Sequence, residues 1–496
     1  MSTSHAPHLH REIGSRQLSM IAIGGAIGTG LFFASGSAIS QAGPGGAMVA
    51  YLVMGLAVYF MMQSLGEMAT QLPIAGSFEA YAERFVDPSL GFALGWNYWF
   101  SWSITLAAEF VAGTLIVRFW FPDSNPTLWA MCFFALLMTL NLLTVKAFAE
   151  AEYWFAGIKV STVLIFLVVG ALMIAGLLGD HAVGFQNWHL QDGKGGEAPF
   201  LGGWTAVLLV FLVAGFSFQG TEGVGLAAAE TADPARNVPK AIGNVFWRIL
   251  IFYIGAMLVV GTLIPFTDPN LLKGDADGAA YSPFTIVFSK IPHIGAYAAN
   301  LMNFVILSAV LSAGNSSLYV SSRMLQALAE RGQAPQMFRR INARGVPVAA
   351  VWATGLVGAL AFFASIVGAQ KFYQLLYNAS GLTGFIIWLG IAICHLRFRK
   401  AWVAQGRPLS ELKFRARFFP WAPWAAVVLF VVVIFGANIG VFQAEGFSWS
   451  DWTTWFDFVS SYITIPLAIA LYLGHKWWHK TRLVPLKDCD FSMPRE

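Results

Sequence analysis

The sequence has few charged residues. Asp, Glu, Lys and Arg make up 11% of its 496 residues, whereas soluble domains contain about 25%. Hydrophobic residues account for 57% of the chain, and the mean hydropathy is +0.62. A water-soluble enzyme, a disordered scaffold and a secreted disulfide-rich module are therefore excluded, and the composition predicts a protein of the lipid bilayer.

Cysteine and cofactor motifs are also scarce. The three cysteines (Cys132, Cys394 and Cys489) form no CxxC pair, so neither a disulfide framework nor a zinc site is expected. The sequence has no Walker loop, no GxGxxG after a strand, no HExxH and no DNA-reading basic helix. We expect no enzyme activity, cofactor, metal or nucleic-acid partner. For a transporter, a proton gradient is then the leading energy source, and sodium is the alternative.

Apolar segments long enough to cross a bilayer recur along the chain. A hydrocarbon core of about 30 Å requires about 20 residues of helix, and the sequence has twelve such segments. They lie at 18–40, 44–70, 92–120, 126–145, 151–178, 203–228, 241–266, 294–328, 347–367, 371–396, 420–439 and 454–476. The segment SPFTIVFSKI before the eighth span is too short to cross and predicts an interfacial helix. The fold class is an all-α integral membrane protein.

The distribution of Lys and Arg predicts the orientation, because these residues accumulate in cytoplasmic loops. With the N-terminus inside, most of the 30 basic residues lie on the cytoplasmic side. Both termini are therefore expected in the cytoplasm. The predicted regions are a tail at 1–17, a core at 18–398, a basic cytoplasmic loop at 399–419, two further helices at 420–478 and a tail at 479–496.

Two spans contain glycine-rich interruptions. The first span carries GGAIGTG at 24–30, and the sixth carries GFSFQGTE at 215–222. Gly24 and Gly28 alone are compatible with close helix packing. The two interruptions lie five spans apart, however, at corresponding positions of two five-helix halves (about 18–178 and 203–398). This pattern is typical of an inverted-repeat transporter with discontinuous helices 1 and 6.

An interrupted helix exposes unpaired N–H groups on one side and unpaired C=O groups on the other. N–H groups around Gly28, Thr29 and Gly30 suit a carboxylate, and carbonyls around Phe216 and Phe218 suit an ammonium group. The two charged ends of an α-amino acid match this arrangement.

Ionisable residues inside spans are functional candidates because they are costly to bury in a membrane. Lys159 in span five is either a proton carrier or a lysine that extends to the cytoplasmic interface. Glu222, directly after the second interruption, either neutralises a cationic substrate or relays a proton, with a structural role as the alternative. Glu67 and Glu109 are weaker candidates for gating, as is Glu230 in the inner loop. Further candidates are the midplane amides Asn315 and Asn378, and aromatic residues that could line the pocket: Tyr98, Trp102 and Phe216.

The ordered motifs MIAIGGAIGTGLF, SQAGPGGAMVAY, SLGEMA, GFALGWNYW, AEYWFAGIKV, GFSFQGTEGVGLAAAE, DPARNVPKAI, SPFTIVF, LSAGNSSLY and NASGLTGFIIWLGIA extend over nearly all of residues 11–482. On these motifs the chain resembles bacterial amino acid permeases of the amino acid–polyamine–organocation superfamily, in particular those that carry lysine. The resemblance implies a leucine-transporter-type fold of ten core helices plus two, in the bacterial inner membrane. It also implies proton-coupled symport of L-lysine by alternating access.

By matching motif, the resemblance implies a substrate site whose members lie in the two interrupted spans and in spans three and eight: Ala26, Ile27, Gly28, Thr29, Gly30, Tyr98, Trp102, Phe216, Ser217, Phe218, Glu222 and Asn315. It implies proton coupling through Glu222 and through Lys159, which matches the span-five lysine that fills the sodium site in sodium-independent relatives. Gly223 stands where the family pattern has a bulky aliphatic residue, which would widen the pocket. The alternatives are a permease for an aromatic amino acid or histidine, and an amino-acid-binding membrane sensor with a regulatory partner.

Overall fold

The computed structural model describes residues 27–74, 76–143, 145–178, 182–193, 195–228, 231, 233–271, 282–436, 458 and 462–493, with the backbone alone for 145–151. Throughout these residues the regular elements are helices, and Gln191 and Glu197 form an isolated antiparallel β-bridge. The all-helical composition agrees with the prediction.

The elements follow one another as short and long helices. In chain order they are η1 (Gly30–Ala34), α2 (Ser35–Gln71), α3 (Phe78–Phe85), α4 (Pro88–Val117), α5 (Pro126–Leu143), α6 (Val145–Ile174), η2 (Gln186–Trp188), α7 (Gly203–Phe218), α8 (Gly223–Ala227), α9 (Pro234–Arg248), η4 (Ile249–Ile254), α10 (Gly255–Leu263), α11 (Pro283–Ser289), α12 (Gly295–Glu330), η5 (Gln336–Arg339), α13 (Val348–Gly358), η6 (Ala359–Phe363), α14 (Ala364–Val367), α15 (Ala369–Ala404), η7 (Leu409–Glu411), α16 (Trp421–Gly436) and α18 (Thr464–His479).

Nine helical segments within the described ranges are long and apolar enough to span a membrane. One of these segments, Gly30–Gln71, overlaps both the first and the second predicted span. The helix is broken within it at Gly43, which has φ 71° and ψ 173°. This positive φ favours glycine, and a Cβ there would lie 2.7 Å from the carbonyl oxygen of Pro199. α16 and α18 fall in the last two predicted spans but have only 16 residues each. The chain is a multi-pass membrane protein, and the count of twelve spans remains a prediction.

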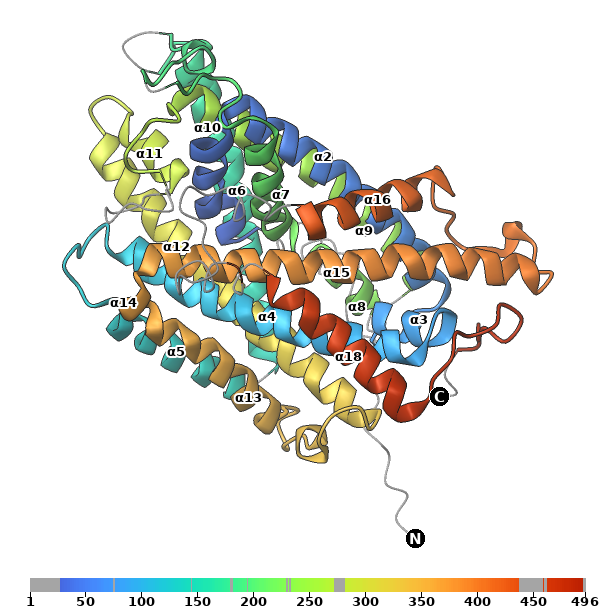
Figure 1. The fold of residues 1–496 in the computed structure, drawn as a ribbon. Helices are drawn as coiled ribbons and strands as arrows, with labels where there is room; N and C mark the ends of the chain where they lie inside the picture. Colours follow the sequence, from blue (N-terminus) through green and yellow to red (C-terminus); the bar gives the residue numbers. More distant parts are fainter. Residues whose placement is uncertain are drawn as a thin grey trace.

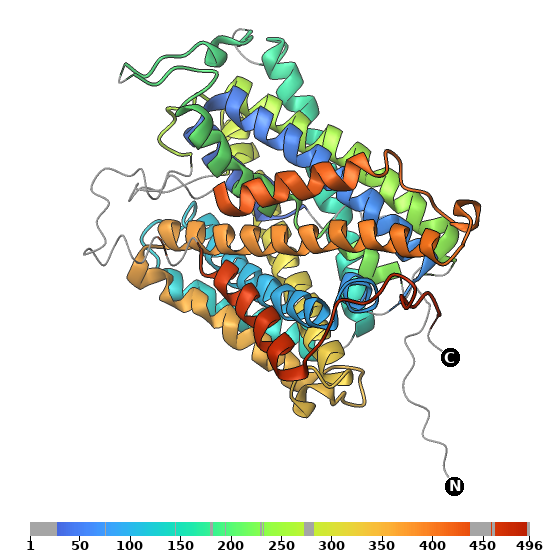
Figure 2. The same ribbon diagram turned by 45° about the vertical axis from the view of Figure 1, so that its right-hand side comes forward.

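The long helix α15 crosses the middle of the molecule (Figure 1). It packs against α4 and α7, and α4 in turn packs against α12. In both views α2 and α16 lie on one side of α15, and α5, α13 and α18 lie on the other (Figures 1 and 2). α15 continues to Ala404, so the first residues of the predicted basic loop at 399–419 are helical. Side chains such as Leu356 and Ile366 are exposed on the outer surface, as expected for a face turned toward lipid.

The short segment before the eighth span forms the helix α11. Ser282 caps it by accepting a hydrogen bond from Phe284 N. Ser282 also donates to the carbonyl oxygen of Phe32, and Phe284 stacks on Phe166 with ring centroids 3.8 Å apart. The predicted short helix is therefore present, and its apolar side chains are covered by protein.

The end of the chain, residues 484–491, forms a C-terminal strap across α3 and the end of α15. Val484 N donates to Val86 O at 2.9 Å, and Gln405 of the turn after α15 donates to the carbonyl oxygen of Cys489 at 2.7 Å. Phe491 is buried, with its ring centroid 5.1 Å from that of Phe85. The residues after the last helix are thus connected to the end of α3 and to the turn after α15.

Candidate functional site

The helix of the sixth predicted span is interrupted between α7 and α8. Its α-helix ends at Phe218, Gln219 is extended (φ −60°, ψ 144°), and helix resumes at Gly223. Gly220 at the turn has φ 92°, a conformation that favours glycine. Residues 219–222 therefore interrupt the regular helical hydrogen bonding, and turn-type bonds such as that from Gln219 N to Phe216 O replace it.

The carbonyls expected to be free at this interruption already have donors. The carbonyl of Phe216 accepts from Gln219 N at 3.3 Å. The carbonyl of Phe218 accepts from Thr221 N at 3.3 Å and from the Thr221 hydroxyl at 2.6 Å. Because a carbonyl oxygen has two lone pairs, the Phe216 oxygen keeps acceptor capacity, whereas the Phe218 oxygen uses both.

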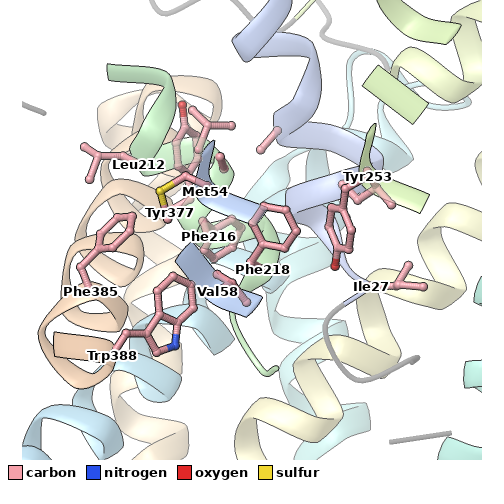
Figure 3. Packing of buried hydrophobic residues seen from close by; sticks show 14 of the residues in the cluster. Ile27, Met54, Val58, Leu212, Phe216, Phe218, Tyr253, Tyr377, Phe385 and Trp388 are labelled. Atoms are coloured by element: carbon pink, nitrogen blue, oxygen red, sulfur yellow. The ribbon is translucent and has the colours of Figure 1, made fainter. Parts of the chain in front are cut away.

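Glu222 lies at the end of the interruption and is 1% exposed. Its Oε2 accepts a hydrogen bond from Trp388 Nε1 of α15 at 3.1 Å, and its Oε1 accepts from Gly220 N at 3.3 Å. Figure 3 shows the Trp388 indole beside Phe385, in the same cluster of buried side chains as Phe216. The carboxylate is thus held at the junction of the interrupted helix and α15.

Arg248, the last residue of α9, is a buried cation that interacts with this carboxylate. It is 2% exposed, donates from Nη2 to the Thr221 hydroxyl, and interacts electrostatically with Glu222. The sequence shows Arg248 only as an isolated charge within an apolar span. Its position against the interruption depends on how α9 packs, so the sequence analysis did not include it among the site residues.

Tyr98 and Trp102 of α4 are buried in the same region, and Tyr98 interacts electrostatically with Glu222. Their ring centroids are 6.0 Å apart. Tyr98 Oη and Trp102 Nε1 have no geometrically acceptable hydrogen-bond partner among the described residues. Buried polar atoms of this kind are usually satisfied by a protein group, water or ligand, which makes both residues suitable for contact with a substrate.

The start of η1 lies against the end of α7. Ile27 and Gly28 precede the helix, which begins at Gly30, and all of these residues are buried. The first N–H groups of a helix have no acceptor within it. A Cβ at Gly30 would lie 2.4 Å from Ser217 Cα, so the two backbones are in direct contact. Gly24, Gly25 and Ala26 lie outside the described residues.

A second buried polar group joins the start of η1 with α4 and α6. The Thr29 hydroxyl donates to Glu109 Oε1 at 2.8 Å, and Glu109 interacts electrostatically with Lys159. Lys159 is 1% exposed, and its Nζ lies 3.6 Å from Glu152 Oε1. Lys159 therefore points at a carboxylate within the protein and does not extend to the surface. Glu152 was not predicted as a site residue, because it lies at the edge of a predicted span, where a charged residue is not unusual.

Two other sequence candidates lie in separate contacts. Asn315 Oδ1 accepts from Asn141 Nδ2 of α5 at 2.7 Å, and Glu67 pairs with Arg399 of α15. Glu230 lies outside the described residues.

Gln219 supplies a network that the sequence analysis did not include. Its Nε2 donates to Ser101 Oγ of α4 at 2.6 Å, and its Oε1 accepts from Ser380 Oγ of α15 at 2.8 Å. Thr383 Oγ1 donates to the same Ser101 oxygen at 2.8 Å. The extended residue at the interruption is therefore bonded to both neighbouring helices. Beside it, a Cβ at Gly223 would meet no heavy atom within 4 Å, so there is room next to Glu222.

A multi-pass helical membrane protein with an interrupted helix and buried charges at the interruption belongs structurally with transporters. The family model for amino acid permeases matches residues 17–487. The chain is 47% identical to the lysine-specific permease LysP of Escherichia coli over 99% of its length and 98% of that protein. It is 46% identical to LysP of Lactococcus lactis, over 98% of the chain and 93% of that protein. It is 43% identical to the histidine permease HisP of Lactococcus lactis, over 97% and 98%.

This chain belongs to the amino acid permease family. It is an amino acid transporter and not an enzyme.

Proposed function

We propose that this protein imports L-lysine across the bacterial inner membrane by proton-coupled symport, with both termini in the cytoplasm. The observation that carries the proposal is the fully buried carboxylate of Glu222 at the interruption of the helix, in a chain 46–47% identical to two lysine-specific permeases. A buried carboxylate is costly unless it meets a cation, and the side-chain ammonium of lysine is such a cation.

In this proposal the substrate binds between the two interrupted helices. Its α-carboxylate meets the first N–H groups of η1 near Gly28 to Gly30. Its α-ammonium meets the Phe216 carbonyl, and its side chain extends past Tyr98 and Trp102 to Glu222. Arg248 also interacts electrostatically with Glu222, so the site combines a fixed positive charge with the one that lysine brings.

Proton coupling is assigned to the second polar group. Lys159 lies between Glu152, at 3.6 Å, and Glu109, with which it interacts electrostatically. Glu109 in turn accepts from Thr29 at the start of η1. A change in the protonation of Lys159 alters the charge balance of this group and, through Thr29, the position of η1. The proton and the substrate then act on the same helix.

The burial of these groups supports a mechanism of alternating access. Glu222, Lys159 and Glu109 are each at most 3% exposed, so a substrate reaches them only when helices move. The interruption at 219–222 is a suitable point for such movement. We propose the ten-helix leucine-transporter-type core, plus two helices, as the frame in which this occurs.

The test is transport in proteoliposomes that contain the purified full-length chain. Labelled lysine should accumulate when the pH gradient is directed inward and sodium is absent. Collapse of the gradient with a protonophore should abolish accumulation. Accumulation that persists without the gradient, or that requires sodium, would contradict the proton coupling.

The second candidate substrate is histidine, because the chain is also 43% identical to a histidine permease. Competition of labelled lysine uptake by each of the twenty amino acids distinguishes the two. Unlabelled lysine should compete at lower concentration than histidine. Stronger competition by histidine would move the assignment to that substrate. Binding without net flux would favour a sensor.

A further inference from the structure

The loop between α15 and α16 contains a cavity that the transport site does not use. Its volume is about 380 Å³, and it is lined by Arg399, Arg415, Ala416, Arg417, Phe418 and Phe419. Three of these six residues are arginines, and this lining contains no carboxylate. The chemistry of the cavity therefore favours an anion.

The arginines of this cavity differ in their partners. Arg399 is already neutralised by a bidentate pair with Glu67 and lies over the ring of Phe419, 4.6 Å from its centroid. Arg415 and Arg417 are exposed, and no ion pair joins either of them to a carboxylate in the part of the chain that the structure describes. The cavity therefore has positive charge that is not used inside the protein.

The backbone between these two arginines is fixed. Ala416 is buried, and its N–H donates to Glu67 Oε2 at 2.7 Å. Arg417 N donates to Gln63 Oε1 at 3.5 Å. Because Ala416 is held inward against α2, the residues on either side face outward together. The pair of guanidinium groups is thus presented by an ordered segment.

An apolar surface begins at the cavity and follows α16. Phe418 next to the cavity is 66% exposed, and Trp421 at the start of α16 is 80% exposed. The exposed apolar side chains continue at helical spacing of three and four residues: Trp424, Val428, Val431, Val432 and Phe435. Tryptophan at the end of such a stripe is typical of the membrane–water interface.

We propose that the arginine cavity and the exposed face of α16 together bind one anionic phospholipid. The phosphate group lies between Arg415 and Arg417, which suit it because guanidinium groups bind phosphate oxygens with two donors. The acyl chains lie along the α16 stripe. A free phosphate ion would use the arginines alone and leave the stripe without a role, so a diacyl lipid fits the combined surface better. In the proposed orientation, on which this inference rests, these arginines lie on the cytoplasmic side, where anionic headgroups are available.

The test uses the purified full-length protein in uncharged detergent, titrated with phosphatidylglycerol while thermal unfolding is followed. The double variant Arg415→Gln/Arg417→Gln should need about tenfold more lipid for half of the stabilisation, because basic residues near the membrane surface each add to the attraction. The matched control is Arg339→Gln/Arg340→Gln, which removes two exposed arginines elsewhere and should respond like the unmodified protein. Equal responses of all three proteins would overturn the proposal.

Two further arms separate the sources of the anion and do not depend on the variants. Inorganic phosphate should leave the unfolding temperature unchanged, and stabilisation equal to that by phosphatidylglycerol would show a site for a free anion only. Native mass spectrometry of the unmodified protein in mixed phosphatidylglycerol and phosphatidylcholine should show preferential retention of phosphatidylglycerol. Equal retention of the two lipids would also overturn the proposal.

Discussion

Gly30 and Ser217 place the backbones of η1 and α7 in direct contact: a Cβ at Gly30 would lie 2.4 Å from Ser217 Cα and 2.9 Å from Ser217 N. Tyr51 of α2 reaches the same point, with its hydroxyl 2.8 Å from Ser217 Oγ. Small residues allow membrane helices to approach this closely. The start of η1 and the last turn of α7 therefore act as one packed unit beside the interruption.

The first prediction concerns this contact. Gly30→Ala should lower the unfolding temperature in detergent and reduce lysine uptake, because the added methyl group overpacks a backbone contact at a cost of about 1–3 kcal/mol. Gly243→Ala is the control, since a Cβ at Gly243 would meet nothing within 4 Å. The close-contact argument fails if both variants unfold at the same temperature as the unmodified protein.

The second prediction concerns Glu222. Glu222→Gln should keep the fold, because the amide oxygen can still accept from Trp388 Nε1. Lysine uptake should fall by roughly tenfold to hundredfold. A hydrogen bond to a charged group contributes about 1.5–3 kcal/mol, and its loss weakens binding by a factor of this size. Initial uptake rates in proteoliposomes measure this, with Glu83→Gln as a control carboxylate outside the site. Unaltered uptake by Glu222→Gln would place the side-chain site elsewhere.

The third prediction concerns Lys159. Lys159→Ala should abolish uptake driven by a pH gradient and leave exchange of lysine for lysine across the membrane, because exchange needs no net proton movement. Both activities are measured on the same vesicles, and Lys240→Ala, at an exposed lysine, should retain both. If the Lys159 variant keeps the full dependence on the gradient, the proton is carried by another group.

The fourth prediction concerns pH and the ion pair between α3 and the end of α12. Glu79 Oε2 lies 2.8 Å from Arg331 Nη1. Burial raises the pKa of Glu79 to about 7, and Arg331 opposes this only in part. Between pH 4.5 and 7, Glu79 is therefore protonated in the folded protein and ionised in the unfolded chain. The free energy of unfolding should decrease as the pH rises through this range.

Thermal unfolding across this pH range tests the fourth prediction. Glu79→Gln should flatten the decrease because it removes the titrating group. Glu83→Gln, at the more exposed neighbour on the same helix, should retain the decrease. A profile of the Glu79 variant that matches the unmodified protein would assign the pH dependence to other residues.

The hydropathy of the sequence predicts most helix positions, because crossing a bilayer imposes a length that composition reveals. The bounds at 126–145 and 294–328 differ by only a few residues from α5 and α12. The interruption near Gly220 was predicted from its glycines and polar residues, and Gly220 has a positive φ, which glycine favours. The break at Gly43 was not predicted, because most glycines that the structure describes do not have a positive φ.

The partners of the buried charges could not be predicted in the same way, because they depend on how distant helices pack. Arg248 and Trp388 meet the 219–222 interruption from α9 and α15, and neither has a sequence signal beyond a polar group in an apolar span. Asn315 lies at a plausible depth, yet its amide bonds to Asn141 of α5. The sequence therefore indicated which polar residues would be buried, whereas the partner of each one could be identified only from the three-dimensional structure.

The C-terminal strap has a practical consequence for anyone who attaches a reporter or purification handle to this permease. Phe491 is buried against the rings of Phe85 and Trp402. A fusion partner attached directly after it would therefore disturb the contacts of the strap with α3 and with the turn after α15. A long flexible spacer would let the strap keep its contacts with α3 and with the turn after α15.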